Sequence, residues 1–285
     1  MTALVTPFHQ GAIDVEAYQR LVERQVEEGT AAVVPVGTTG ETSTLSLEEH
    51  IGVVKACVEA TAGKVPVIAG VGANNTAESI SLAEQAAEAG ANGLLAVTGY
   101  YNRPSQDGLI AHFTALADAT DLPVILYNVP SRTACDISVE TMAVLARHPR
   151  IAGVKDATGN LARVARQRLA CGEDFIQLSG EDATALGFNA MGGVGCISVA
   201  ANIAPRHYAE FQNAMLEGRW DDARALQDKL TPLSDALFAD TSPGPAKYAL
   251  AKLGLCQEEL RLPLVPASEK AKIAVTRALE GLDLI

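Results

Sequence analysis

Short apolar segments rich in β-branched residues recur eight times along the first 200 residues of the chain, and helical patterns separate them. The segments are ALVTPF, AAVVPVG, VPVIAGVG, GLLAVTG, PVILYNV, IAGVKDA, FIQLSGED and VGCISVA. Strands that alternate with helices form βαβ units with a parallel sheet. Eight such units predict an α/β fold, a closed (β/α)8 TIM barrel. An open doubly wound sheet is less favoured, because no G-x-G-x-x-G follows the first strand and GVGANN is a weak match.

Polar residues and glycines mark the predicted helix ends. A side chain that accepts a hydrogen bond from the first turn is typical of a helix start, and glycine is typical of its end. We expect helices to open at Asp14, Ser46, Thr76, Ser105 and Ser138 and to close at Gly29, Gly63 and Gly90.

The strand signal stops after about Ala204, and helical periods continue to the C-terminus. The segment TSPGPAK, from Thr241 to Lys247, predicts a rigid turn into a new helix. We therefore expect a catalytic barrel over residues 1–220 and a helical domain over residues 221–285. No low-complexity linker separates the two, so we expect them to pack together.

Composition excludes several classes of function. The formal net charge is −12 and no Lys/Arg cluster occurs, which argues against nucleic-acid binding. No basic leader and no apolar run of spanning length appear, so we expect neither a signal peptide nor a membrane segment. The five cysteines are odd in number and lack C-x-x-C pairs, which favours reduced thiols in the cytoplasm. The five histidines are scattered, so a metal site is not expected. We also expect no cofactor.

The predicted strands end in polar motifs, and the chemistry of a (β/α)8 barrel gathers at the C-terminal ends of its strands. The motifs are GTTGE, TGYYNRP, YNVPSRT, KDATG, SGED and ISVAAN. They combine hydroxyl groups with an arginine and a lysine, and contain no histidine and no cluster of carboxylates. This inventory does not suit a metallohydrolase or a glycosidase with paired carboxylates.

Lys155 lies in the apolar segment IAGVKDA, where burial of an ammonium group is costly. Strand alternation predicts that Lys155 faces the barrel interior together with Ile151 and Gly153, with Gly153 leaving space beneath the lysine stem. On the preceding strand the same alternation turns Tyr127 inward with Ile125, so we expect the lysine and the phenol to share a pocket floor.

A buried amine beside a phenol has a chemical use. Burial favours the neutral amine, which attacks a carbonyl to form a Schiff base, and the iminium then accepts electrons as a carbon–carbon bond is made or broken. Arg132, just past the strand of Tyr127, is suited to grip a carboxylate. The alternative is that Lys155 extends to a rim carboxylate such as Asp156 or Glu181.

Five motifs, GTTGE, YYNRPSQDGL, ILYNVPSRT, GVKDATG and LSGEDATAL, occur in an order that resembles the dihydrodipicolinate synthase family over nearly the whole chain. The resemblance implies a (β/α)8 barrel with a C-terminal helical domain. It also implies the condensation of pyruvate with aspartate semialdehyde, the first committed step of lysine and diaminopimelate biosynthesis.

The resemblance further implies a role for each matching residue. The catalytic set is Lys155 for the Schiff base, Tyr127 for proton transfer, and Thr38 and Tyr101 for the rest of a proton relay. In the family this Tyr101 reaches in from a neighbouring subunit, and dimers usually pair into tetramers. The substrate-binding set is Thr39 and the backbone of Ile197 for the pyruvate-derived part, and Arg132 for the carboxylate of the aldehyde.

The family also implies feedback inhibition by lysine at a dimer interface. The matching positions are Thr42, Ser43, Leu47, His50, Asn74, Glu78 and Tyr100. Leu47 replaces a histidine of some inhibited members, which predicts reduced sensitivity. Gly99 replaces the usual proline, which predicts a looser loop around the two tyrosines. An alternative for NNTAE is a plain helix cap and first turn.

Two rival functions remain. One is another Schiff-base enzyme of the same superfamily, such as a sialic acid lyase or a sugar-acid aldolase or dehydratase. GTTGE and the arginine of PSRT favour a small carboxylated aldehyde over a long sugar. The other rival is a barrel that only binds a small metabolite, which has no need for a buried lysine beside phenols.

Overall fold

A computed structural model describes all residues of the chain, from Met1 to Ile285. The chain forms two compact units. We call Ile68–Ile197 the central unit, and Met1–Val67 together with Ser198–Ile285 the terminal unit. Each unit is described by itself.

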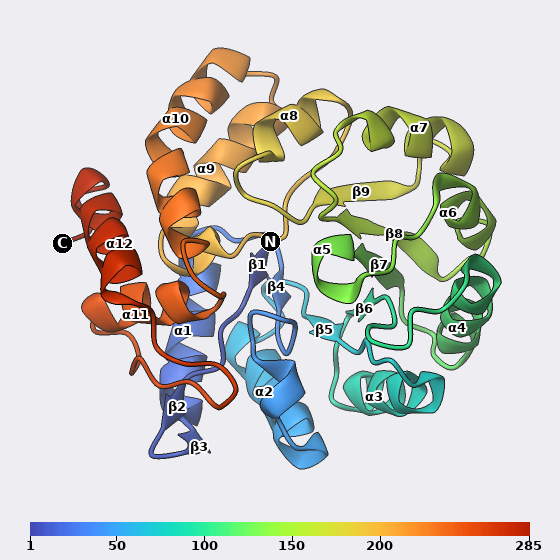
Figure 1. Cartoon of the computed structure of the whole chain (residues 1–285), viewed down its shortest axis with the longest axis horizontal. Coiled ribbons are helices and arrows are strands. Elements are labelled where there is room, and N and C mark those ends of the chain that lie inside the picture. The colour runs from blue at the N-terminus through green and yellow to red at the C-terminus, as the bar shows by residue number, and fades with distance from the viewer. The chain divides into compact units, whose positions relative to one another are not determined.

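A parallel sheet of five strands forms the core of the central unit, and its strands follow one another in chain order (Figure 1). The strands are almost wholly buried, which explains why their sequences are continuous apolar runs rather than alternating ones. A bridge from Ser179 to Cys196 extends the edge of this sheet. The strands are β5 (Ile68–Gly70), β6 (Gly93–Val97), β7 (Val124–Asn128), β8 (Ile151–Asp156) and β9 (Ile176–Ser179).

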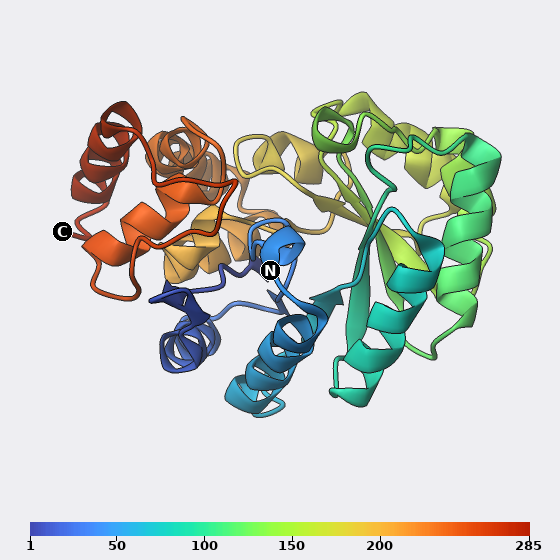
Figure 2. The ribbon, with the colours of Figure 1, turned by 60° about the horizontal axis from the view of Figure 1, so that its bottom comes forward.

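Helices connect these strands, as parallel pairing requires. In Figures 1 and 2, α3, α4, α6 and α7 lie in a row along one side of the sheet, with their axes along the strands. The face of α4 toward the core buries Leu109, Phe113 and Leu116, at the spacing of an amphipathic helix. The helices are α3 (Thr76–Glu88), α4 (Gln106–Asp118), α5 (Pro130–Thr133), α6 (Val139–Leu145), α7 (Ala162–Cys171) and α8 (Ala185–Ala190).

The terminal unit contains the first two predicted barrel strands. β1 (Thr2–Ala3) pairs in parallel with β4 (Val33–Val34), and single bridges join Thr2 to Ser198 and Val33 to Val67. β2 (Phe8–His9) and β3 (Ala12–Ile13) form a short antiparallel hairpin between β1 and the first helix.

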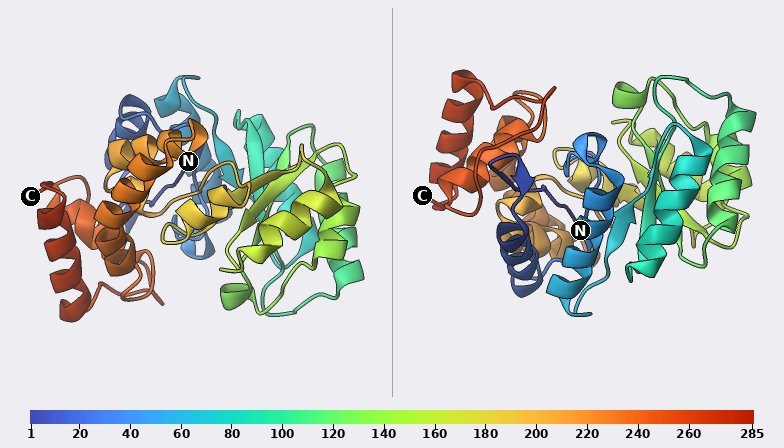
Figure 3. Two further views of the ribbon diagram at one scale, coloured as in Figure 1. Left: turned by 90° about the horizontal axis from the view of Figure 1, so that it is seen from above. Right: turned by 90° about the horizontal axis from the view of Figure 1, so that it is seen from below.

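Helices make up the rest of the terminal unit. α1 packs against α2, and the C-terminal helices form a second group in which α10 contacts both α9 and α12 while α11 contacts α12 (Figure 3). None of the helices in the chain combines the length and apolar character needed to cross a membrane. The elements are α1 (Val15–Glu27), η1 (Thr42–Thr44), α2 (Leu47–Thr61), η2 (Ala200–Asn202), α9 (Pro205–Leu216), α10 (Trp220–Leu237), α11 (Gly244–Lys252) and α12 (Glu269–Gly281).

The predicted boundary at residue 220 falls where α10 begins, and the division into domains there remains a prediction. The helix caps can be compared residue by residue. The side chains of Asp14, Ser46, Ser105 and Ser138 cap their helices as predicted.

The predicted cap at Thr76 is wrong by one position. Asn75 caps α3 because its side-chain oxygen accepts a hydrogen bond from the backbone N–H of Ala77. The Thr76 hydroxyl instead lies 2.9 Å from Nδ1 of His112 on α4.

Candidate active site

Lys155 and Tyr127 lie side by side at the C-terminal ends of neighbouring strands. The register of the ladder pairs Ile125 with Gly153 and Tyr127 with Lys155. Both side chains are buried, with exposed fractions of 5% for Lys155 and 7% for Tyr127. The Lys155 ammonium nitrogen lies 4.2 Å from the centroid of the Tyr127 ring. The structure therefore brings together the amine and the phenol, as strand alternation predicts.

Lys155 forms no ion pair, so the alternative of a lysine extended to a rim carboxylate is not seen. The carboxylate of Asp156 is bonded instead by Thr158, Arg163 and Gln167. The Glu181 carboxylate accepts a hydrogen bond from the Thr184 hydroxyl. A buried ammonium without a carboxylate partner is unusual, and it makes the group available for chemistry.

The expectation that Gly153 leaves space beneath the lysine stem is wrong. A Cβ atom at this position would lie 2.2 Å from the carbonyl oxygen of Ile176 and 2.6 Å from its Cβ. The missing side chain therefore admits the neighbouring strand β9. The pairing of β7 with β8 also leaves out Ala152: Val124 pairs with Ile151, and the next residue, Ile125, pairs with Gly153. The regular alternation that relates Gly153 to Lys155 is therefore interrupted before Ile151.

A buried polar network holds the ends of β7 and β8. Arg163 on α7 donates to the carboxylates of Asp156 and Asp136 and to the carbonyl oxygen of Ile137. The side-chain amide of Asn128 donates to Asp136, and its oxygen accepts from the backbone N–H of Ile137. Asn128 and Asp156 directly follow Tyr127 and Lys155, so the network fixes the backbone beside both reactive groups. Sequence reasoning missed Arg163, whose position in a polar helix gives no local signal of burial.

Arg132 lies on α5, the single turn that begins at Pro130 directly after β7. Its side chain is exposed and forms no ion pair, so the guanidinium is available to a carboxylate. Ile197 is fully buried, and its backbone N–H donates to the carbonyl oxygen of Ser179 at 2.9 Å. The carbonyl oxygen of Ile197 is therefore the backbone group that remains for a ligand.

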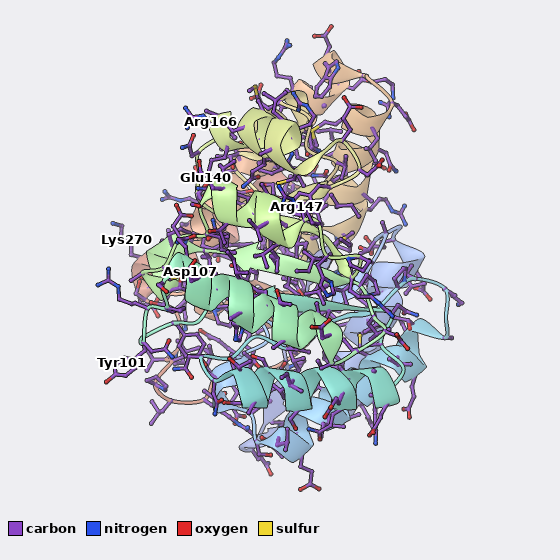
Figure 4. The ribbon with its side chains drawn as sticks, turned by 90° about the vertical axis from the view of Figure 1, so that its right-hand side faces the viewer. Tyr101, Asp107, Glu140, Arg147, Arg166 and Lys270 are labelled. Carbon is purple, nitrogen blue, oxygen red and sulfur yellow. The ribbon has the colours of Figure 1, made fainter.

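Tyr101 projects from the loop after β6, with 92% of its surface exposed (Figure 4). Its φ of 72° is left-handed, which a tyrosine adopts rarely. The loop is anchored by the side-chain amide of Asn102, which donates to the carbonyl oxygen of Asn74 at 2.8 Å. Gly99 has no positive φ, and the loosening predicted for it stays a prediction.

The motif GTTGE forms a tight turn after β4 in the terminal unit. Thr38 is exposed and Thr39 is buried. Backbone N–H groups of Gly40 and Glu41 donate to the carbonyl oxygens of Gly37 and Thr38 at 3.0 and 3.1 Å.

Glu41 ends this turn in the left-handed conformation, and its buried carboxylate forms an ion pair with Lys247 of α11. Burial lowers the pKa of the Lys247 ammonium, and the charge of Glu41 opposes that shift. Sequence reasoning missed this second buried lysine. The small and apolar residues around it in GPAKYALA were the available signal.

The residues that match a lysine-binding site fall in both units. Thr42 and Ser43 lie in η1, while Leu47 is exposed and His50 buried on α2. In the central unit, burial raises the pKa of Tyr100, and the charge of Glu78 adds to that shift. Glu78 belongs to the first turn of α3, so the alternative of a helix cap and first turn for NNTAE is also realised.

The chain contains no group of three or more His, Cys, Asp or Glu side chains arranged to hold a metal ion. None of the five cysteines forms a disulfide bond.

Comparison with known proteins places the chain in a family. The model of the dihydrodipicolinate synthetase family matches residues 1–282. The chain belongs to this family. A family member from Ruegeria pomeroyi, named 4-hydroxy-tetrahydrodipicolinate synthase, is 58% identical over 285 residues, which cover 100% of this chain and 98% of that protein.

Solved structures of family members share the fold. The 4-hydroxy-tetrahydrodipicolinate synthase of Methylacidiphilum fumariolicum SolV is 44% identical to this chain, with a TM-score of 0.97. The match covers 99% of this chain and 94% of that protein's chain. A chloride-inhibited enzyme from Acinetobacter baumannii in complex with pyruvate is 42% identical, and one from Cyanidioschyzon merolae with lysine bound is 38% identical. Both have TM-scores of 0.97. The matches cover 100% of this chain, together with 98% of the Acinetobacter chain and 97% of the Cyanidioschyzon chain. The predicted fold class, a TIM barrel with a C-terminal helical region, is confirmed.

Proposed function

We propose that the chain is a 4-hydroxy-tetrahydrodipicolinate synthase that condenses pyruvate, as a Schiff base on Lys155, with L-aspartate semialdehyde. The observation that carries this proposal is the buried Lys155 ammonium, free of any carboxylate partner and 4.2 Å from the Tyr127 ring centroid. The relative from Ruegeria pomeroyi that bears this name, at 58% identity over the full chain, supports the same assignment.

The reaction begins when the Lys155 ammonium gives up a proton and the resulting amine attacks the keto carbon of pyruvate. The carbonyl oxygen leaves as water, and a carbon–nitrogen double bond forms. The resulting iminium acidifies the methyl group, which loses a proton to give an enamine. The enamine carbon attacks the aldehyde carbon of the second substrate, and the aldehyde oxygen takes up a proton. This step restores an iminium on Lys155. The amino group of the second substrate then attacks the iminium carbon and closes a ring, and the Lys155 amine leaves, which releases the product. Tyr127, in contact with the Lys155 ammonium, is the group we assign to these proton transfers.

We assign the remaining contacts from the chemistry of each group. The exposed guanidinium of Arg132, which has no carboxylate partner, suits bidentate binding of the aldehyde's carboxylate. The Thr39 side chain and the carbonyl oxygen of Ile197 would hold the pyruvate-derived part, and the Thr38 hydroxyl would pass protons to and from Tyr127.

Tyr101 completes the proposed relay from a neighbouring subunit. Its ring is almost fully exposed and projects from the loop after β6 (Figure 4). An aromatic ring held in this way suits insertion into a second copy of the chain. We propose a homo-oligomer, a tetramer built from dimers, and expect Tyr101→Phe to lower kcat far more than it changes the affinity for pyruvate. Equal losses in both would indicate a binding role.

A lysine effector is proposed for the site that includes Glu78 and Tyr100. The carboxylate of Glu78, whose charge adds to the raised pKa of Tyr100, supports recognition of an ammonium group, and a structure of a relative carries bound lysine. Titration of lysine into a turnover assay tests this proposal. Activity that stays flat into the millimolar range would refute it, and Glu78→Gln should abolish any inhibition seen.

A coupled assay with pyruvate and aspartate semialdehyde, run beside an assay for cleavage of sugar acids, tests the reaction itself. We expect turnover in the first assay and none in the second. Turnover of a sugar acid alone would replace the proposal with the lyase alternative, and pyruvate binding without turnover would favour a non-catalytic binder. Location in the cytoplasm remains a prediction.

A further inference from the structure

The chain buries a second lysine, which the proposed reaction does not use. Lys247 on α11 is 0% exposed. Its ammonium forms an ion pair with Glu41, donates to the carbonyl oxygen of Glu259 at 2.8 Å, and lies 4.1 Å from the centroid of the Phe8 ring. Complete burial of an ammonium group is costly, so a lysine in this position is expected to have a defined partner.

That partner closes the turn that carries Thr38 and Thr39. Glu41 is 1% exposed and has a φ of 55°, a left-handed conformation that is strained for a residue with a side chain. Such a conformation persists only where surrounding contacts hold it. The contacts here are the Lys247 ammonium and the backbone N–H of Arg261, which donates to the Glu41 carboxylate at 3.2 Å.

The opposite side of the same turn is held without charges. The Thr6 hydroxyl donates to the carbonyl oxygen of Gly40 at 2.7 Å. A Cβ atom at Gly40 would lie 3.1 Å from the carbonyl oxygen of Leu4, so the turn lies close against the strand segment after β1. The turn is therefore fixed between this segment and the C-terminal helical region, and Lys247 supplies the cation on the helical side.

A second cation from the helical region supports the same loop. The Arg261 guanidinium donates to both carboxylate oxygens of Glu49, at 2.6 and 2.7 Å, and to the carbonyl oxygen of Thr44 at 3.1 Å. It also lies 4.4 Å from the centroid of the Phe8 ring, which Lys247 contacts as well. The helical region therefore contacts both ends of the segment from Glu41 to Glu49, through Lys247 at Glu41 and through Arg261 at Glu49.

We propose that Lys247 is a positioning residue for the reaction: through its buried ion pair with Glu41 it sets the backbone of the Gly37–Glu41 turn and so places Thr38 and Thr39. This inference rests on the proposed function, which gives these threonines their roles. It assigns to the C-terminal helical region a direct part in shaping the catalytic turn.

The test compares variants in which the charge balance of the buried pair is kept. Lys247→Met alone would leave the Glu41 carboxylate buried without its cation, so the main variant is the double substitution Lys247→Met with Glu41→Gln. Lys272→Met is the matched control, because Lys272 also lies in the helical region and also pairs with a carboxylate, that of Glu258, but is partly exposed.

Three quantities are measured for each full-length protein. Thermal unfolding shows that the variant folds. Borohydride reduction with pyruvate, read by mass spectrometry, counts the fraction of chains whose Lys155 reacts. The coupled assay then gives the KM for pyruvate and kcat, and kcat is divided by the fraction of chains with a reactive Lys155. This normalisation separates misplacement of the turn from simple loss of folded protein.

We expect the double variant to lose about tenfold to a hundredfold in kcat/KM per reactive site, as misplaced binding groups do, while the control stays within about twofold of the unchanged chain. A kcat/KM per reactive site for the double variant that lies within about twofold of the unchanged chain would overturn the proposal. If the double variant does not fold, Lys247→Arg decides alone, because it keeps the charge of the pair and changes only the shape of the cation in a fully buried site. A loss of about fivefold in kcat/KM per reactive site is expected, and no loss refutes the inference.

The outcome also distinguishes this inference from the proposed function. An unchanged chain without turnover on pyruvate and aspartate semialdehyde refutes the proposed function. An active unchanged chain with an equally active double variant refutes only the role of Lys247.

Discussion

Replacement of Gly153 by alanine should damage both stability and catalysis, because a strand occupies the place of the missing side chain. The new Cβ atom would lie 2.2 Å from the carbonyl oxygen of Ile176, where ordinary contacts begin at 3.4 Å. The obstacle is backbone, so no side-chain rotation relieves it, and β8 and β9 must separate by about 1 Å. Overpacking of this kind costs about 1–3 kcal/mol, and we expect the upper end of that range.

The loss can be measured in two ways. A destabilisation of about 3 kcal/mol lowers the Tm of a chain of this size by about 5 °C. Lys155 lies two residues further along the same strand, so a displacement of about 1 Å there should lower kcat/KM by up to about a hundredfold. Thermal unfolding followed by circular dichroism gives the first value, and the coupled assay gives the second.

Gly52 provides the matched control. It lies inside α2, is exposed, and a Cβ atom there would have nothing within 4 Å. Gly52→Ala should therefore stabilise the chain by about 0.5–1 kcal/mol, the opposite sign from Gly153→Ala. A Gly153→Ala protein that unfolds within about 1 °C of the unchanged chain and retains its kcat/KM would refute the account of β8 and β9 packing.

Two further predictions concern charged groups. Hydrogen bonds from Arg261 lower the pKa of Glu49 from its ordinary value of 4.5 to about 2, so the free energy of unfolding should fall as the pH drops from 4.5 toward 2. Denaturant titrations should show a shallower fall for Glu49→Gln, and identical slopes would contradict this. Arg163→Met leaves the buried Asp156 carboxylate without its cation, so it should lower the free energy of unfolding by about 3–5 kcal/mol in denaturant titrations. The control is Arg166→Met, on the exposed face of α7 (Figure 4), which should change the free energy of unfolding little. Equal losses in the free energy of unfolding for the two variants would exclude a stabilising role for the polar network around Arg163.

The features that depend on local periodicity could be predicted from the sequence. Strand alternation has a period of two and parallel neighbours keep a regular register, so the pairing of Tyr127 with Lys155 followed from the two segments alone. Helix caps depend on the residues of one turn, and four of the five predicted caps are correct. The fifth differs because Asn75 and Thr76 both suit a helix start, and the hydroxyl of Thr76 has a partner on another helix.

The features that depend on segments distant in the sequence could not be predicted. The function of Gly153 is decided by how closely β9 approaches, and no pattern near Gly153 reports that distance. Lys247 and Glu41 are separated by about 200 residues, and each lies in a segment with its own local explanation, a helix start and a tight turn. Their pairing arises only when the C-terminal helices pack, so a lysine with a structural partner and a lysine without one look alike in the sequence.

The most direct test of the central claim is to find which lysine carries pyruvate. The chain has two buried lysines with opposite environments, Lys155 without a carboxylate partner and Lys247 paired with Glu41. Borohydride reduction in the presence of pyruvate, followed by peptide mapping, should place the pyruvate-derived mass on the peptide with Lys155, and Lys155→Met should abolish it. An adduct on Lys247 or another residue, or no adduct at all, would contradict the account.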